Sequence, residues 1–322
     1  MTIAAVPQAE QLALAETPFQ QVWRTFRKDR LAMAGLYVLV TLLALALLGK
    51  LVTEWWVVFD PATVRLPDKL HPPFSAASPE LPAGDAPPWG IYPFGTDELG
   101  RNVFARMLQG SFVSLSVGIV AVSISLVIGI SLGGLAGFYG ERKWGPFSVD
   151  GLIMRFTDVV LCFPTFFLIL TVVALLPPSI YNIMIVIGMT SWMGTARFVR
   201  AEFLSLRERD FVTAAQALGL PEWRIIFRHM VPNAMAPVLV SASIDVAYAI
   251  LTESALSFLG FGVRPPFATW GNILADGRAY IFDAPWLFAI PGTAILIVVL
   301  AFNLVGEGLR DAMNPRLRKR AS

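Results

Sequence analysis

Six long apolar runs set the strongest limit on how this chain of 322 residues can fold. A helix needs about 20 predominantly apolar residues to cross a bilayer, where every backbone polar group must be paired internally. Only 15% of the residues are charged, against about 25% in soluble domains. The sequence therefore predicts an all-α integral membrane protein with six transmembrane helices. We place them at 31–52, 112–138, 153–176, 182–199, 236–259 and 286–306. The fourth is diluted by Thr190, Ser191 and Thr195.

The distribution of Lys and Arg predicts the side of the membrane on which each connection lies, because cytoplasmic loops carry an excess of both. With the N-terminus inside, the inner segments hold 18 of the 25 Lys and Arg residues, so both termini are expected in the cytoplasm. Met1 to Glu16 are too polar for a signal peptide, and the first span is expected to stay uncleaved. The expected parts are a cytoplasmic tail (1–30), a first span (31–52), an extracytoplasmic loop or lid (53–111), a five-span core (112–306) and a cytoplasmic tail (307–322).

The Pro-rich segment 53–111 is too long for a tight turn and predicts a small external cap after the first span. Within it, residues 95–110 place four apolar residues on one face at helical spacing: Val103, Phe104, Met107 and Leu108. This pattern predicts an interfacial helix that leads into the second span.

The second span carries Gly129, Gly133 and Gly137, which form two consecutive G-x-x-x-G steps. Small residues at every fourth position let the backbones of membrane helices approach closely. These glycines therefore predict a helix that packs deep in a bundle and does not face lipid on all sides.

A polar segment, 207–233, interrupts the apolar pattern and predicts two short helices. Asp210 is suited to cap the first, and Gly219 is placed to end it. Pro221 suits the first turn of the second helix, which Pro232 is expected to stop. The second helix carries Trp223, Ile226, Phe227 and Met230 on one face and Arg224 with Arg228 on another. The small, uncharged surface of Ala214, Ala215, Ala217 and Gly219 suits a closely approaching partner; the alternative is a helix that only rests on lipid headgroups.

The run TAAQALGLPEWRIIFRHMVPN, residues 213–233, resembles the cytoplasmic EAA loop of bacterial ABC-importer permeases. Ala214, Ala215, Gly219 and Pro232 stand in register with that motif. The chain departs from the motif at Thr213, His229 and Val231, where the family has Glu, Ile and Leu. Segments 94–118 and 258–274, with both terminal regions, resemble the C-type subunit of the dipeptide, oligopeptide and nickel branch.

The resemblance implies a type I ABC-importer permease fold, with a conserved five-helix core after an extra first helix, in the bacterial inner membrane. It implies that segment 207–233 is a coupling loop that docks in a groove of an ATP-binding subunit. Ala214, Ala215 and Gly219 would then be the contact surface, flanked by Arg224 and Arg228, and Thr213 supplies no carboxylate for docking. The implied partners are a second homologous permease, two ATP-binding subunits that bind ATP and Mg²⁺, an external substrate-binding protein and membrane lipid, with no nucleic acid.

Two acidic residues fall within the fifth span, where ionisable groups are costly and point to function. Asp245 and Glu253 could serve interhelical polar packing, line a translocation path or relay protons, and the sequence leaves these alternatives open. In the third span, Asp158 is expected to form an ion pair with Arg155 of the same helix.

The sequence shows no nucleophile–base pair, no metal cluster and no Walker-type phosphate loop, so we expect a transport subunit that is not an enzyme and holds no cofactor or metal. The resemblance implies import of di- or oligopeptides driven by ATP hydrolysis in other subunits. Nickel chelates and glutathione remain alternatives within the branch. An ion-coupled secondary transporter and a structural or assembly membrane protein are the alternatives from other classes.

Overall fold

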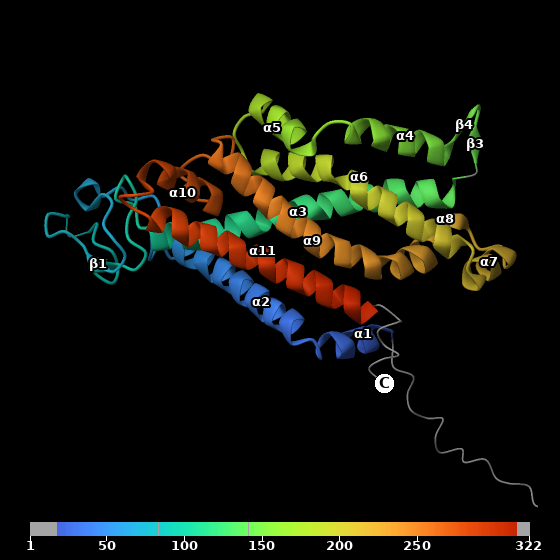
Figure 1. Ribbon diagram of the computed structural model, residues 1–322, viewed down its shortest axis with the longest axis horizontal. Helices are drawn as coiled ribbons and strands as arrows, with labels where there is room; N and C mark the ends of the chain where they lie inside the picture. Colours follow the sequence, from blue (N-terminus) through green and yellow to red (C-terminus); the bar gives the residue numbers. More distant parts are fainter. Residues whose placement is uncertain (1–17, 83, 141, 314–322) are drawn as a thin grey trace, which may run out of the picture.

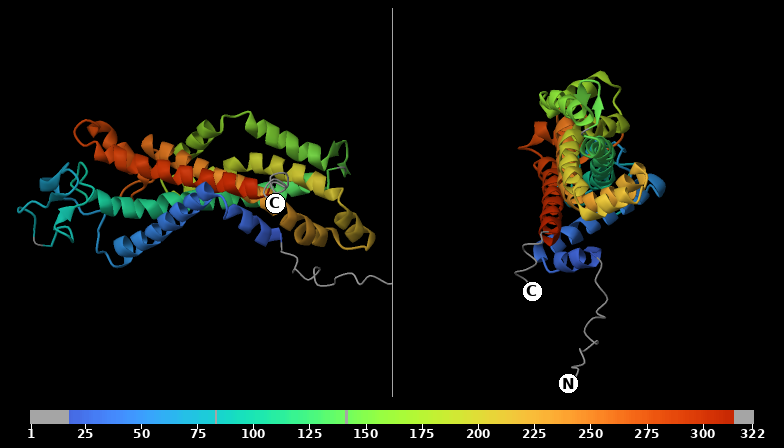
Figure 2. Two further views of the ribbon diagram at one scale, coloured as in Figure 1. Left: turned by 60° about the horizontal axis from the view of Figure 1, so that its bottom comes forward. Right: turned by 90° about the vertical axis from the view of Figure 1, so that its right-hand side faces the viewer.

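A computed structural model of the chain describes residues 18–82, 84–140 and 142–313, and it is an elongated bundle of long helices (Figures 1 and 2). A cap with little regular structure, formed by residues 56–82 and 84–102, lies at one end of the bundle. A helical hairpin, which begins at residue 210, lies at the other end (Figure 1). The helices are α1 (Pro18–Phe26), α2 (Arg30–Lys50), α3 (Val103–Phe138), α4 (Val149–Leu161), α5 (Thr165–Leu175), α6 (Ile180–Arg207), α7 (Asp210–Ala217), α8 (Glu222–Arg224), α9 (Val231–Phe258), α10 (Trp270–Gly277) and α11 (Trp286–Met313). Two antiparallel pairs of short strands join β1 (Ser75–Ala76) to β2 (Ile91–Tyr92) and β3 (Lys143–Trp144) to β4 (Phe147–Ser148).

Four described helices are long and apolar enough to cross a membrane: Arg30–Trp55, α3, Glu222–Phe258 and α11. The bent pair formed by α4 and α5 could supply a fifth crossing. Helix α6 has 28 residues but is more polar, as expected from Thr190 and Ser191 and from Arg197 further along. By length and composition, the described helices therefore account for four or five of the six predicted spans.

The third predicted span, 153–176, is wrong as a single helix, because α4 and α5 meet at an angle of 79°. Pro164 lies in the break, and a proline disfavours helical geometry at the residue before it. The predicted ion pair of Asp158 with Arg155 is wrong as well. The Asp158 carboxylate instead accepts a hydrogen bond from Arg197 of α6, which ties the α4 half of the pair to the bundle.

Helix α3 begins at Val103, nine residues before the predicted boundary of the second span. The Asn102 side chain caps it by accepting hydrogen bonds from the amides of Phe104 and Ala105, at 3.0 and 3.4 Å. The predicted interfacial helix is therefore the first part of one continuous helix of 36 residues. At about 1.5 Å per residue, α3 is longer than the roughly 30 Å hydrocarbon core that it would cross.

The three glycines of the G-x-x-x-G pattern lie where α3 packs against α6. A Cβ atom on Gly129 would stand 2.7 Å from the Thr195 Cβ, and one on Gly133 would stand 2.3 Å from the Ala196 carbonyl oxygen. A Cβ atom on Gly137 would stand 2.5 Å from the Phe203 Cβ. Each distance is shorter than van der Waals contact, so the absence of side chains sets how closely the two helices approach.

Two helices extend past the predicted ends of their spans. Helix α2 continues through a π-helical turn, Leu51–Trp55, past the predicted end of the first span at residue 52. Helix α11 continues to Met313, although the tail was expected to begin at residue 307. The first 17 residues of the predicted N-terminal tail and residues 314–322 of the C-terminal tail lie outside the described residues.

The cap is organised around Asp68, a fully buried carboxylate. Its oxygens accept hydrogen bonds from the Ser78 amide, at 3.1 Å, and from the Tyr92 hydroxyl. The Thr96 hydroxyl donates to the Asp68 carbonyl and accepts a hydrogen bond from the His71 amide at 2.7 Å. Segments that are far apart in this irregular part of the chain are thus joined through one acidic side chain.

We expect the cap to lose stability in acid. Burial alone would raise the pKa of Asp68, but hydrogen bonds from Ser78 and Tyr92 outweigh it and lower the pKa below its ordinary value. Because the folded-state pKa is depressed, the stabilisation is present at neutral pH and is lost as the pH falls from about 4 through the folded pKa. Hydrogen exchange at Phe74, whose amide donates to the Tyr92 carbonyl, should report this loss.

The matched variant for this test is Asp68→Asn, which should remove the acid-dependent step and lower protection at neutral pH. Protection factors, corrected for the intrinsic pH dependence of exchange, are the measurement. If protection in the wild-type cap is the same at about pH 3 as at pH 7, Asp68 does not stabilise the cap in this way.

Candidate functional site

The predicted hairpin is present at the end of the bundle opposite the cap (Figure 1). Helix α7 ends in a paired turn: the Gly219 amide donates to the Gln216 carbonyl at 2.9 Å, and the Leu220 amide donates to the Ala215 carbonyl at 3.2 Å. Gly219 has a φ of 69°, a left-handed conformation that glycine adopts without a Cβ penalty. Gly219 therefore ends the first helix, as predicted.

The ends of the hairpin helices differ slightly from the prediction. The N-cap of α7 is Arg209, and Asp210 is the first residue of the helix. Pro221 is the N-cap of α8, one position before the predicted first turn. Both shifts are of one residue and leave the bend at Gly219 unchanged.

The prediction that Pro232 stops the second helix is wrong, because helix runs continuously from Glu222 to Phe258. A π-helical turn, Ile225–Met230, precedes the proline, and the Val231 amide bonds to the Ile226 carbonyl, five residues back. The proline lies in the first turn of α9, where the bonding register changes and its missing N–H is tolerated. The Asn233 side chain donates to the His229 carbonyl at 2.6 Å.

The small-residue surface of α7 is only partly as predicted. Ala214, Ala217 and Gly219 are exposed, and Leu218 beside them is 80% exposed. Ala215 is buried and packs with Val212 against the end of α6, so it is not available to a partner. Successive helix residues are about 100° apart, and Ala214 and Ala215 therefore face in different directions. Thr213 is exposed, and its hydroxyl donates to the Asp210 carbonyl at 3.0 Å.

The apolar face that was predicted for the second helix is only partly buried against the rest of the protein. Trp223 and Phe227 are exposed, whereas Ile225 and Met230 are buried. The Arg224 guanidinium lies over the Trp223 ring, 5.4 Å from its centroid. Arg228 is exposed on the same segment, so cationic and aromatic side chains flank the hairpin together.

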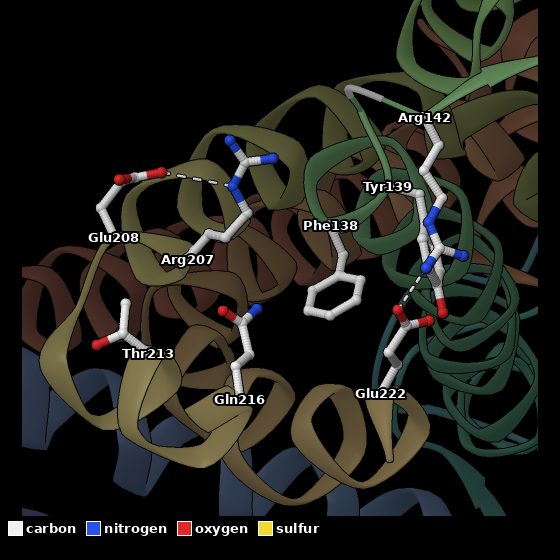
Figure 3. A pocket seen from close by; sticks show the side chains of 8 residues that line it. All are labelled: Phe138, Tyr139, Arg142, Arg207, Glu208, Thr213, Gln216 and Glu222. Atoms are coloured by element: carbon white, nitrogen blue, oxygen red, sulfur yellow. Dashed lines mark hydrogen bonds and ion pairs between the residues drawn. The ribbon is translucent and has the colours of Figure 1, made fainter. Parts of the chain in front are cut away.

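A polar pocket of about 380 Å³ separates the hairpin from the end of α3 (Figure 3). Arg142 bonds to Glu222 on one side of this pocket, and Arg207 bonds to Glu208 on the other (Figure 3). Burial, helped by a hydrogen bond to Glu222, raises the pKa of Tyr139. The Arg142–Glu222 pair is exposed, so it adds little stability but does orient the hairpin.

The two acidic residues of α9 have different surroundings. Glu253 is fully buried and accepts hydrogen bonds from the Ser257 hydroxyl, at 2.7 Å, and from the Ser114 hydroxyl of α3, at 3.3 Å. Asp245 lies in a small cavity among α3, α6 and α9, with a hydrogen bond from Ser241. Glu253 is therefore held by polar contacts with the neighbouring helix, whereas Asp245 borders a cavity between the helices.

Comparison with known families agrees with this geometry. Residues 125–319 match the family described as "binding-protein-dependent transport system inner membrane component". The chain belongs to this family. Residues 17–73 match a second family, described as the "N-terminal TM domain of oligopeptide transport permease C". As a member of the family, the chain is an ABC-importer permease and a multi-pass inner membrane protein, and the alternatives of a secondary transporter and an assembly protein are set aside.

Two relatives match this permease over nearly its whole length. The dipeptide transport system permease protein DppC of Alkalihalophilus pseudofirmus is 37% identical over 97% of this chain and 94% of its own. The di/tripeptide transport system permease protein DppC of Pseudomonas aeruginosa is 38% identical over 98% of each chain. A solved chain of the MetNI methionine ABC transporter, in an inward-facing conformation, aligns with a TM-score of 0.50 at 17% identity over 66% of this chain and 98% of that chain. At that identity the likeness concerns the fold alone, which is the membrane fold of a type I importer.

Proposed function

We propose that this permease carries di- and oligopeptides across the bacterial inner membrane within an ATP-driven importer. It would pair with a second, homologous permease, two ATP-binding subunits and an external substrate-binding protein. The peptide class rests on the names of the two relatives and on the match to an oligopeptide permease model. ATP and Mg²⁺ would bind to the partner subunits.

We further propose that α6 and the α4–α5 pair both cross the membrane, which gives six spans with both termini in the cytoplasm. The Lys and Arg distribution supports this orientation, because it assigns the hairpin and both termini to the same, positively charged side. In this arrangement the cap of residues 56–102 lies outside, where a binding protein delivers substrate.

The observation that carries the proposal is the exposed hairpin tip, formed by Thr213, Ala214, Ala217, Leu218 and Gly219. The exposed Leu218 and the small alanines beside it offer a flat, uncharged surface that a partner can approach closely. The flanking Arg224 and Arg228 can form ion pairs with acidic groups at the rim of such a partner. We assign this tip as the surface that docks on an ATP-binding subunit.

The packing of the hairpin explains how movement of an ATP-binding subunit would reach the membrane. Val212 and Ala215 pack in one cluster with Val199 and Phe203 of α6. The second helix of the hairpin is continuous with α9, which carries Asp245 and Glu253. A displacement of the tip would therefore move α6 and α9 together relative to their neighbours.

A pair of substitutions at Gly219 tests the coupling role. Gly219→Ala adds only the strain of a left-handed backbone, about 1–2 kcal/mol, because a Cβ atom here meets nothing within 4 Å. Gly219→Trp adds the same strain and a bulky ring on the docking surface. We expect Gly219→Ala to retain most ATP-driven uptake and Gly219→Trp to abolish it, while both insert into the membrane normally. Uptake into proteoliposomes with the complete complex is the measurement.

Two results would contradict the proposal. Full uptake by Gly219→Trp would show that the tip does not transmit movement. Substrate identity is tested separately by competition in wild-type complexes: unlabelled dipeptides should block uptake of a labelled dipeptide, whereas uptake of a nickel chelate or of glutathione alone would replace the peptide assignment.

A further inference from the structure

We propose that Asp245 binds the positively charged amino group of the peptide as it passes through the membrane. The inference rests on the proposed function and deepens it by naming the part of the substrate that the site recognises. It starts from a cavity of about 70 Å³ that α3, α6 and α9 enclose together. Five of the lining residues are polar: Ser125, Ser191, Asp245, Tyr248 and Thr252.

The cavity lies at the depth expected for a transport site. Asp245 is at the middle of α9, about 20 Å from either end at 1.5 Å per residue. The polar residues Ser241, Asp245, Tyr248 and Thr252 follow one another at helical spacing along this helix. Tyr248 is 66% exposed and the other three are partly exposed, so the cavity borders the surface of the chain beside Tyr248. A lipid-facing helix surface would be apolar, and this one is suited to an aqueous path.

Asp245 also lacks a positively charged side chain as a partner among the described residues. Its hydrogen bond comes from the Ser241 hydroxyl, one turn earlier. A carboxylate in a membrane span ordinarily pairs with an opposite charge or faces a water-filled cavity. Glu253, two turns further along the same helix, is enclosed by hydroxyl donors and sealed from solvent. Asp245 therefore retains the capacity to bind a cation that Glu253 has lost.

The chemistry of the lining selects an ammonium group. An ionised carboxylate can accept hydrogen bonds but cannot donate them. The hydroxyl oxygens of Ser191, Tyr248 and Thr252 can each accept a hydrogen bond as well. An ammonium group offers three donors and a positive charge, which matches that set. A cavity of about 70 Å³ is too small for a whole dipeptide and holds its amino end. The remainder would lie along the open face of α9.

The first experiment measures charge selection directly, with small thiol reagents as probes. The chain has a single cysteine, Cys162, so a Cys162→Ser background leaves no native thiol in this subunit. A Ser191→Cys reporter in assembled complexes is treated with an ethylammonium or an ethylsulfonate methanethiosulfonate. We expect the cationic reagent to be favoured, and Asp245→Asn to lower the ratio of the two rates at least tenfold. A Thr252→Cys reporter repeats the measurement if the first variant does not assemble.

The second experiment measures transport of dialanine, an unblocked dipeptide. Asp245→Asn should lower the maximal uptake rate at least tenfold while ATP hydrolysis is still stimulated by loaded binding protein. Asp245→Glu keeps the charge and should retain more of the rate. Asp283→Asn, which removes an exposed carboxylate outside the spans, is the matched control and should transport normally.

The outcomes separate the inference from the proposed function. Reporter thiols that do not react with either reagent, or a rate ratio unchanged by Asp245→Asn, would overturn the binding role of Asp245. Normal dialanine uptake by Asp245→Asn would overturn it as well. The wild-type complex could fail to transport dialanine and still show the charge-dependent ratio of reagent rates. That result would contradict the peptide class of the proposed function but would support a cation-binding cavity at Asp245.

Discussion

Gly133→Ala is expected to destabilise the permease, although alanine is the better helix former by about 1 kcal/mol. The new Cβ atom would stand 2.3 Å from the carbonyl oxygen of Ala196, which is backbone and cannot rotate away. Helix α6 must therefore move from α3, with an expected cost of about 1–3 kcal/mol. The thermal midpoint of the detergent-purified protein is the measurement.

Gly194→Ala is the matched control for this substitution. It lies on α6, two residues before Ala196, and a Cβ atom there meets nothing within 4 Å. The same change should raise the thermal midpoint slightly, since only helix propensity is altered. Effects of the same sign at both positions would show that the close approach of α3 and α6 does not depend on Gly133.

Arg106→Leu is expected to release α10 from the start of α3. The Arg106 guanidinium donates to buried Asp97 at 2.6 Å and to Asp276 of α10 at 2.9 Å. Arg101 completes the cluster, at 2.7 Å from Asp97 and 3.3 Å from Asp276. Removing one member of a buried ion cluster leaves an uncompensated charge, which costs about 3–5 kcal/mol. Proteolysis of the segment between α9 and α11 in intact vesicles should accelerate.

The control for that experiment is Arg264→Leu, which removes an exposed arginine from the same segment. Surface changes of this kind alter stability by about 0.5 kcal/mol or less, so its proteolysis rate should match the wild type. Equal rates in both variants would mean that the four-residue cluster of Asp97, Arg101, Arg106 and Asp276 does not hold α10.

Hydrophobic periodicity and residue size are enough to predict much of the fold. Runs of apolar residues located the long helices, since a helix that crosses a bilayer must be apolar over about 20 residues. Gly129, Gly133 and Gly137 marked the closely packed face of α3 because only small residues permit that approach. Gly219 marked the end of α7 because it adopts a positive φ.

Other features depend on contacts that a single sequence does not display. The break at Pro164 lay inside an apolar run that was long enough for one helix. Pro232 alone predicts the end of a helix. The preceding π-helical turn changes the register of the backbone hydrogen bonds, and the helix continues. In the hairpin, the burial of Ala215 depends on where α6 lies. Asp245 and Glu253 share a helix and an apolar context, and only the neighbouring helices show that Glu253 is sealed from solvent whereas Asp245 borders a cavity.

The continuity of helix from Glu222 to Phe258 has a mechanical consequence. Its 37 residues extend over about 55 Å, longer than the bilayer is thick, with the hairpin at one end, Asp245 about two-thirds of the way along and Pro237 between them. A tilt of this helix by about 10° would shift its far end by roughly 10 Å. The π-helical turn lies close to the end where force would be applied, so stiffness there sets how much motion reaches the membrane. Changes to the buried residues of that turn, Ile225 and Met230, should alter how far α9 moves without changing the docking surface.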